Sequence, residues 1–381
     1  MTATVAPVSI ATPTIATPLD ADTLRKLATQ PGPCITLLIP ASHPGTLEGL
    51  RRAVITDLLK SAKRQLHDHK WCADSEALLV PMRDFAAAME SVGPGTAVFS
   101  APGFFHAALA PEVPLPIAKV ANHFLIAPLA ESVFAPQEFH ILALNRKALR
   151  LIHFNRGRCS EVPLPDSVPA NEEAFELMDS SDHELRNRST AGPGHGAMGA
   201  VVFGTTTGTE SRRDKEHHFY LAVDRGLKEV VRDGLLMLAG VREEVFEYRR
   251  AVHHCRLMEG MLEGSPDHIA TAQLAAEAAR ASVEHYHLLG EIVMGKIREM
   301  PDRGRSLEGM REVLKAAEAG RVHQLCAAED AESLGDLHHP HSREDLVNAA
   351  IVETLRYAGE VFLLPKDRMP VASPVAAILR Y

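Results

Sequence analysis

The sequence lacks the paired cysteines and the long apolar runs that mark disulfide-rich and membrane-spanning proteins. Its five cysteines are odd in number and widely separated, and they include no C-x-x-C pair, which is typical of reduced thiols. No apolar run approaches the roughly 20 residues that a bilayer-spanning helix needs. The first eighteen residues carry neither the basic nor the continuous apolar part of a signal peptide, so we expect a disordered tail over 1–18. These absences predict a globular protein that stays in the cytoplasm and has no membrane partner.

An excess of positive charge is also missing. The chain has 40 basic and 49 acidic residues, a net charge of −9, which argues against a protein that coats DNA with a generally basic surface. Contact with nucleic acid must therefore come from local basic patches. With 381 residues, of which 46% are hydrophobic, the chain is long enough for two or three domains with ordinary cores.

The common hydrolase and nucleotide-binding signatures are absent or incomplete. There is no G-x-S-x-G, and no group of carboxylates is placed for two-metal chemistry. Gly194–Gly199 matches G-x-G-x-x-G, but no strand pattern precedes it and no helix pattern starts in it, which excludes a dinucleotide fold. Gly290–Lys296 resembles a phosphate loop but has Ile297 where the magnesium-binding hydroxyl belongs. We expect no cofactor and no metal site, and His338–His341 is the best candidate for one among the histidine groups.

The first folded segment, 19–132, has the pattern of an α/β domain. It contains an apolar strand and a helix, followed by a hairpin around the turn Ala101–Gly103. The predicted elements are a strand at Cys34–Ile39, a helix from Thr46 to Lys70, and hairpin strands at Thr96–Ser100 and Phe104–Leu109.

The helix of this segment carries many basic side chains outside its apolar stripe. We interpret them as a solvated helix face, with contact to RNA as the alternative. As a secondary RNA-binding set they are Arg51, Arg52, Lys60, Lys63 and Arg64.

The middle segment, 133–265, begins as an antiparallel meander and continues with a glycine-rich stretch and an amphipathic helix. We expect a mixed sheet flanked by helices. The predicted elements are strands at Phe139–Leu144, Leu149–Phe154 and Arg158–Leu164, a short helix at Asn171–Met178, a helix at Ser211–Asp233, and strands at Leu235–Ala239 and Cys255–Leu262.

The third segment, 266–381, alternates helix and strand in short units, which predicts a compact α/β/α sandwich. A long helix opens it at Ser265-Pro266, a capping hydroxyl followed by proline at the first helical position. The predicted elements are helices from Ser265 to Met300, at Ser306–Ala319 and at Ser342–Ala358, and strands at Val322–Cys326 and Val361–Leu364.

The candidate binding site is the glycine-rich loop 185–209. It has six glycines and no carboxylate between Glu184 and Glu210, so backbone N–H groups are accessible and nothing repels an anion. A long loop anchored on a rigid helix is a common way to present the backbone to a partner. The predicted RNA-binding residues are Arg186, Arg188, Gly192, Gly194, His195, Gly196, Gly199, Arg212, Arg213 and Lys215.

The order of these elements resembles the archaeo-eukaryotic class 1 release factors and Pelota, and most closely their bacterial branch, which includes Balon-like ribosome-associated factors. The resemblance covers nearly the whole chain beyond the tail. It implies a mixed α/β (α+β) fold in three domains, with an RNase H-like middle domain and a C-terminal α/β/α sandwich of the ribosomal L7Ae type. The residues that carry it are Ala191–Gly199, Phe219–Asp224, Leu235–Gly240, Val313–Val322 and Ala376–Tyr381.

The resemblance also implies a function at the ribosomal A site, with the ribosome (rRNA and tRNA) and a translational GTPase as partners and no DNA. Release factors of this family carry Gly-Gly-Gln, but this chain has no Gly-Gly pair and no glutamine in the loop. The resemblance therefore favours a factor of hibernation, rescue or stress that does not hydrolyse peptidyl-tRNA, and no catalytic residue is predicted. Two alternatives stay open: a peptidyl-tRNA hydrolase that uses His195 as a base, and a stress protein that has kept the fold and lost the ribosome.

Overall fold

The computed structural model describes residues 18–42, 49–69, 71, 75–89, 93–110, 113, 115–145, 147–178, 208–264, 271–299, 304–329, 343–369 and 373–381. The side chains of 208–212, 271–272 and 343–345 are not among the described ones. The expected tail, except Pro18, and the glycine-rich loop up to residue 207 lie outside these ranges. Within them, no helix combines the length and the apolar character that a membrane span requires, and Cys34, Cys159, Cys255 and Cys326 are free thiols.

The chain divides into two compact units. One contains the residues up to Ala135 together with Tyr286–Tyr381, and the other is Pro136–His285. The helix α8 (Thr271–Glu299) contributes its first half to the second unit and its second half to the first. Three separate sheets are present in the described residues, so the expected mixed α/β fold is confirmed. The division into three domains at the expected boundaries stays a prediction.

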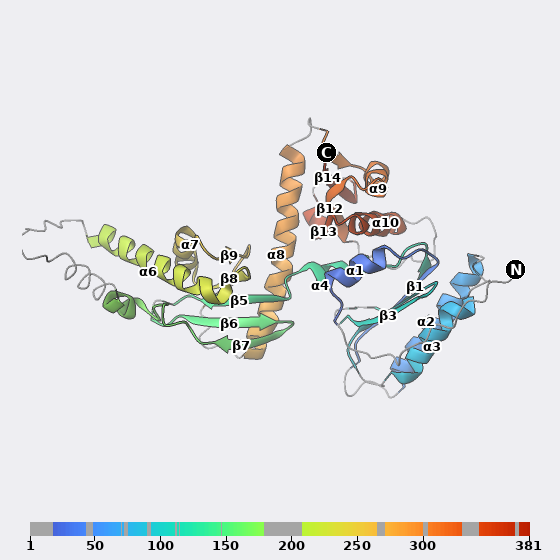
Figure 1. The fold of residues 1–381 in the computed structure, drawn as a ribbon, viewed down its shortest axis with the longest axis horizontal. Helices are drawn as coiled ribbons and strands as arrows, with labels where there is room; N and C mark the ends of the chain where they lie inside the picture. The colour runs from blue at the N-terminus through green and yellow to red at the C-terminus, as the bar shows by residue number, and fades with distance from the viewer. Residues whose placement is uncertain are drawn as a thin grey trace, which may run out of the picture. The chain divides into compact units, whose positions relative to one another are not determined.

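The N-terminal sheet is antiparallel, with the order β3-β2-β1-β4. Its strands are β1 (Cys34–Ile39), β2 (Thr96–Ala101), β3 (Phe104–Leu109) and β4 (Ile117–Ala121). The helices α2 (Leu50–Asp68) and α3 (Ser75–Ala88) pack on one face through a shared apolar core (Figure 1). The predicted strand and hairpin are confirmed. The short helix α1 (Ala21–Ala28), which we did not predict, begins where Asp20 accepts a hydrogen bond from the Thr23 N–H.

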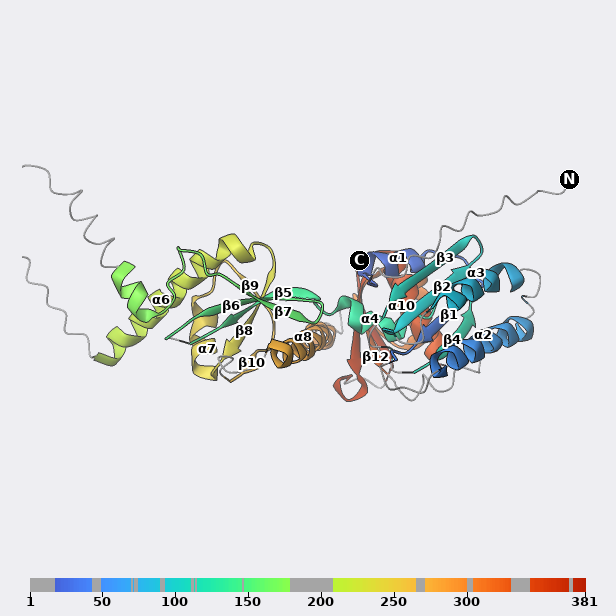
Figure 2. The same cartoon turned by 90° about the horizontal axis from the view of Figure 1, so that it is seen from below.

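The middle sheet is mixed, with the order β10-β8-β5-β6-β7. Strands β5 (Glu138–Ala143), β6 (Arg150–Asn155) and β7 (Arg158–Val162) form the predicted antiparallel meander, and β8 (Leu235–Gly240) pairs in parallel with β5. Leu142 and Leu238 face the helices α6 (Gly208–Val231) and α7 (Arg242–Ala251), whereas Ile141 and Ala239 face the first half of α8. Both faces of β5 and β8 are thus covered, which explains their uninterrupted apolar sequences. Figure 2 shows the sheet within this unit.

One predicted strand of the middle segment is wrong in part. The structure has no continuous strand at Cys255–Leu262. Two strands of two residues each, β9 (Arg256–Leu257) and β10 (Leu262–Glu263), pair in parallel with β8 instead. Between them Gly260 adopts a φ of 78°, and Arg249 donates hydrogen bonds to the Met258 and Gly260 carbonyls. A side chain therefore satisfies carbonyls that a continuous ladder would have paired.

The C-terminal sheet has the order β11-β14-β12-β13. Its strands are β11 (Ser306–Glu308), β12 (Val322–Glu329), β13 (Glu360–Pro365) and β14 (Val375–Leu379). The helices α9 (Met310–Glu318) and α10 (Arg343–Arg356) lie on one side of it and the second half of α8 on the other (Figure 1), as expected for an α/β/α sandwich. The predicted helix at Ser306–Ala319 is corrected: its first three residues form β11, and Gly309, with a φ of 120°, separates this strand from α9.

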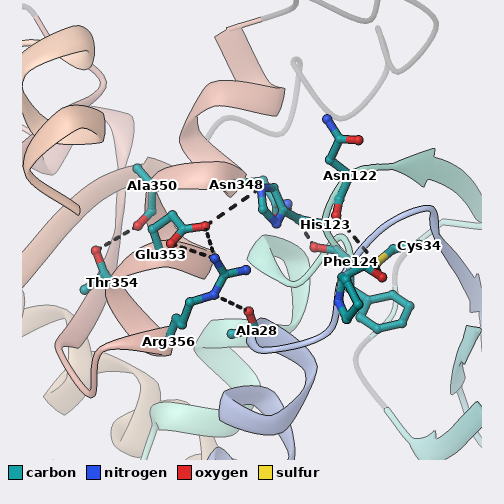
Figure 3. A network of polar contacts seen from close by, with 11 residues as sticks. Ala28, Cys34, Asn122, His123, Phe124, Asn348, Ala350, Glu353, Thr354 and Arg356 are labelled. Atoms are coloured by element: carbon teal, nitrogen blue, oxygen red, sulfur yellow. Dashed lines mark hydrogen bonds and ion pairs between the residues drawn. The ribbon is translucent and has the colours of Figure 1, made fainter. Parts of the chain in front are cut away.

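Within the first unit, α10 is joined to the N-terminal segment by buried polar contacts (Figure 3). The Asn348 amide accepts hydrogen bonds from the Ile126 and Ala127 N–H groups and donates one to the Phe124 carbonyl. The guanidinium of Arg356 donates to the Ala28 carbonyl and pairs with Glu353. The contacts of Asn348 satisfy the N–H groups at the start of α4 (Ala127–Phe134), a helix whose N-cap makes no side-chain hydrogen bond.

Candidate functional site

Most of the predicted RNA-binding loop lies outside the described residues. This applies to Arg186, Arg188, Gly192, Gly194, His195, Gly196 and Gly199, and the Arg212 side chain is likewise not described. The role of these residues stays a prediction. The structure describes the helix that follows the loop, α6, together with Arg213 and Lys215 on it.

Helix α6 is long and is only partly buried. Its 24 residues correspond to about 36 Å at 1.5 Å per residue. Among its described side chains, the first fully buried ones are Phe219 and Tyr220, and burial continues at Val223, Leu227 and Val231. The Phe175 ring, from the short helix at 172–178, packs against Phe219 at 6.0 Å between centroids. The C-terminal half of α6 therefore anchors in the core, and the half next to the loop carries exposed side chains.

The turns of α6 next to the loop carry exposed cations. Arg213 and Lys215 are both exposed, and the Lys215 ammonium lies 3.0 Å from a carboxylate oxygen of Glu176. Both partners of that pair are more than half exposed, so the pair contributes little energy and leaves Lys215 available to another anion. The two predicted residues whose side chains are described thus lie where solvent and a partner can reach them.

Asp224 fixes the buried half of α6, and our sequence analysis missed it. Its carboxylate is fully buried and accepts hydrogen bonds from the N–H groups of His253, His254 and Cys255 and from the His254 ring. Burial by itself raises the pKa of Asp224, but the hydrogen bonds from His253 and its neighbours outweigh it, and the pKa is lowered. The His253-His254 pair is therefore part of a helix anchor. In the sequence, the one indication of this role is a carboxylate on the apolar side of the predicted helix.

A glycine allows α6 to approach the segment before the loop. A Cβ on Gly226 would lie 2.5 Å from the Val168 side chain and 2.9 Å from the Ser167 carbonyl oxygen. Because both distances are shorter than a real contact, a larger residue would push the helix away from residues 167–168. Gly226 thus allows α6 to lie against the segment before the loop, while Asp224 holds the same helix to residues 253–255.

The secondary basic set on α2 needs one correction. Arg51 is buried, because its guanidinium donates to the Ser42 hydroxyl at 2.9 Å and to the Gly93 and Pro94 carbonyls at 2.6 and 2.8 Å. Burial lowers its pKa. An arginine that serves as a hydrogen-bond hub inside the fold is not available to RNA. The other four members, Arg52, Lys60, Lys63 and Arg64, are exposed.

One group of side chains in the described part of the chain is able to hold a metal ion. Glu131, His287 and Glu329 each offer one ligand atom, and these atoms lie within 4.8 Å of one another. The His287 Nε2 is 2.8 Å from a Glu131 oxygen. Partial burial raises the pKa of Glu329, and the charge of Glu131 raises it further. The loop His338–His341, which the sequence left open as a metal site, is outside the described residues.

Residues 138–321 match the family described as Bacterial archaeo-eukaryotic release factor family 3. The matched stretch begins with β5, includes the glycine-rich loop and α6, and ends directly before β12. A search of the curated proteins finds no match.

Solved structures of the archaeal translation termination factor aRF1, of Pelota and of Dom34 are also similar to the chain. The archaeal aRF1 is 14% identical, over 95% of this chain and 99% of that one, with a TM-score of 0.25. Archaeoglobus fulgidus Pelota is 11% identical, over 96% and 93%, with a TM-score of 0.35. S. cerevisiae Dom34, described as a termination-like factor that interacts with Hbs1, is 13% identical over 73% of each chain, with a TM-score of 0.30. These TM-scores are below 0.5, so the match of residues 138–321 to the family is the finding used below.

Proposed function

We propose, on the premise that this chain belongs to the release factor and Pelota superfamily through residues 138–321, that it is a ribosome-associated translation factor. In this proposal it binds the A site in hibernation, rescue or stress, and it does not hydrolyse peptidyl-tRNA. The family match over the segment with the glycine-rich loop is the observation that carries the proposal. Contacts to tRNA and to a translational GTPase follow from the family resemblance alone and belong to the same proposal.

The composition of the loop supports binding without hydrolysis. It has no Gly-Gly pair and no glutamine, so the residues that define the release motif of the family are missing. What the loop retains is glycine backbone, Arg186, Arg188 and His195, with no carboxylate from 185 to 209. These groups suit contact with phosphates, because exposed backbone N–H groups and arginines both donate hydrogen bonds to phosphate oxygens.

The described base of the loop supports the same proposal. Asp224 and Gly226 fix the buried half of α6, and Arg213 and Lys215 are exposed three or more residues before the first buried ring. A rigid helix that carries cations next to a glycine-rich segment presents positive charge at a defined position. This accounts for RNA binding by a chain with a net charge of −9, because binding to phosphate depends on local cations.

Co-sedimentation with bacterial ribosomes over a series of salt concentrations tests the proposal. The binding constant K falls with salt, and each lost phosphate contact should reduce the steepness of log K against log salt by about 1. The double variant Arg213→Gln with Lys215→Gln should therefore reduce it by about 2. The matched control is Arg225→Gln with Lys228→Gln, which removes the same charge from exposed positions further along α6. Equal slopes for the two double variants, or no sedimentation of the wild type at low salt, would contradict the proposal.

A peptide-release assay on ribosomes loaded with peptidyl-tRNA separates binding from hydrolysis. We expect no release above background with the wild type, and we expect His195→Ala to weaken ribosome binding only modestly. If His195 acts as a base, the wild type releases peptide and His195→Ala does not.

A further inference from the structure

Three side chains from distant parts of the sequence meet in the first unit. Glu131 lies on α4, His287 on α8, and Glu329 is the last residue of β12. Their ligand atoms lie within 4.8 Å of one another, and the imidazole and the Glu131 carboxylate are 2.8 Å apart. No motif links these positions in the sequence, so the fold alone brings them together.

The backbone on both sides of His287 is fixed against the sheet. The hydroxyl of Tyr286 donates to the Val361 carbonyl at 3.0 Å and accepts from the Leu363 N–H at 2.8 Å. One turn later, a Cβ on Gly290 would lie 2.8 Å from the Leu364 side chain, so glycine is what allows α8 to lie this close to β13.

The strand that ends at Glu329 is tied to the same turn of α8. The Cys326 thiol, three residues before Glu329, lies 3.7 Å from the Gly290 carbonyl oxygen. The helix position that carries His287 and the strand position that carries Glu329 are therefore set by packing and by hydrogen bonds between side chains and the backbone. The backbone positions of these two ligands are thus fixed before an ion binds.

We propose that Glu131, His287 and Glu329 bind a divalent transition metal of the zinc type. Imidazole nitrogen and carboxylate oxygen are both ligands of Zn²⁺, and a site with three protein ligands leaves a fourth position for water. Ligand atoms of a tetrahedral zinc site lie about 3.4 Å apart, as follows from metal–ligand distances of about 2.0–2.2 Å. The exposed Glu329 side chain is able to close the remaining distance by a rotation about its own bonds.

Exposure and charge both suit this assignment. The side chains of His287 and Glu131 are 9% and 24% exposed, and Glu329 reaches solvent, so an ion has an entry path. Within the described part of the chain, the charged groups that act on Glu329 are Glu131 and His287, with no lysine or arginine among them. Two carboxylates facing one imidazole keep a negative charge in either protonation state of the ring, and a cation neutralises it.

Zinc uptake by the full chain tests the site. The protein is stripped with a chelator, dialysed against Zn²⁺ and, separately, Mg²⁺, and its metal content is measured by atomic emission. Other histidines and cysteines of the chain contribute a background, so the difference between variants is the readout. We expect Glu329→Gln and His287→Gln each to lose one equivalent of zinc relative to the wild type. Little Mg²⁺ should bind in any variant, because this ion prefers oxygen ligands.

The controls are His323→Gln and Glu308→Gln, two exposed positions of the same sheet, which should keep the full zinc content. Circular dichroism verifies that every variant is folded. Only a loss in both Glu329→Gln and His287→Gln supports the site. Unchanged zinc in either variant, or no zinc in the wild type, overturns it. Because no ribosome is involved, failure of this test leaves the proposed function untouched, and the reverse also holds.

Discussion

At the scale of single residues, several charged side chains have roles that their residue type alone does not reveal. Arg51 and Arg52 are neighbours on α2, yet the first is buried in a network of carbonyls and the second is exposed. The helical period places both on the side that the sequence marks as basic. Only the position of the loop at Gly93-Pro94, folded back over the helix, distinguishes them. This is a tertiary contact, and composition and periodicity do not contain it.

The first prediction concerns Arg51. Arg51→Ala should lower the free energy of unfolding by about 2–3 kcal/mol, because it leaves buried carbonyls of Gly93 and Pro94 without a donor. Arg51→Lys should not restore the loss, since one ammonium does not reproduce the two-pronged contact of a guanidinium. The matched control is Arg52→Ala, which should change stability by less than about 0.5 kcal/mol. Urea unfolding measures all three, and equal stability of Arg51→Ala and Arg52→Ala would refute the structural role.

The second prediction concerns Asp224 and pH. Its folded-state pKa is lowered, so its contribution to stability is fully present above the unfolded value of about 3.9 and is lost as the pH falls through the folded value. Asp224→Asn should cost about 2 kcal/mol at pH 7, because the new amide group faces N–H donors. The difference between the wild type and this variant should shrink below about pH 4.

The control for Asp224 is Asp214→Asn, an exposed position of the same helix, which should follow the wild type at every pH. Denaturant unfolding between pH 7 and pH 3 makes the comparison. A difference between the wild type and Asp224→Asn that stays constant over this range would show that the charge of Asp224 does not stabilise the fold.

At the scale of elements, apolar patterns predict the buried strands well. The strand at Cys34–Ile39 and the hairpin that follows it, the meander of the middle segment and the strand at Leu235–Ala239 are all confirmed. The side chains of β1, β2 and β8 are buried as their apolar patterns require, whereas those of β7 are mostly exposed. The predicted elements are wrong where a glycine or a tertiary contact determines the backbone conformation. Ser306–Glu308 has a helix-compatible sequence but pairs with β14, and Gly309 ends that strand. The segment 255–262 is interrupted at Gly260, whose carbonyl accepts a hydrogen bond from Arg249 of helix α7.

The third prediction concerns the junction between α10 and α4. In Asn348→Asp the carboxylate still accepts the two N–H groups of Ile126 and Ala127, but it faces the Phe124 carbonyl without a proton to donate. This variant should be less stable than the wild type by about 2 kcal/mol at pH 7. It should recover as the pH falls, because the protonated carboxyl group donates to that carbonyl. A buried acid whose pKa is higher in the folded state stabilises the fold only when it is protonated, so the stability of this variant should rise relative to the wild type as the pH falls.

Thermal unfolding at several pH values checks this, with Asn155→Asp at an exposed strand end as the control. The control should show no such recovery. If Asn348→Asp is as stable as the wild type at neutral pH, the amide does not hold α4 to α10 in the way the structure indicates.

At the scale of the whole molecule, the order of the segments gives the resemblance to release factors and Pelota, and the match of residues 138–321 to a bacterial archaeo-eukaryotic release factor family agrees with it. The structure adds what order cannot supply: an anchored α6 with exposed cations next to the loop, and a group of potential metal ligands drawn from three elements. Glu131, His287 and Glu329 are far apart in the chain and share no local pattern. A site of this kind becomes visible only when the fold places its residues together.

We propose that this chain occupies the ribosomal A site, and competition with tRNA tests this proposal most directly. Binding of the full chain is measured by sedimentation at low salt with two ribosome preparations, one with an empty A site and one with tRNA bound there. We expect binding to the first preparation and a loss of binding to the second. Equal binding to both preparations, or binding to neither, would contradict it.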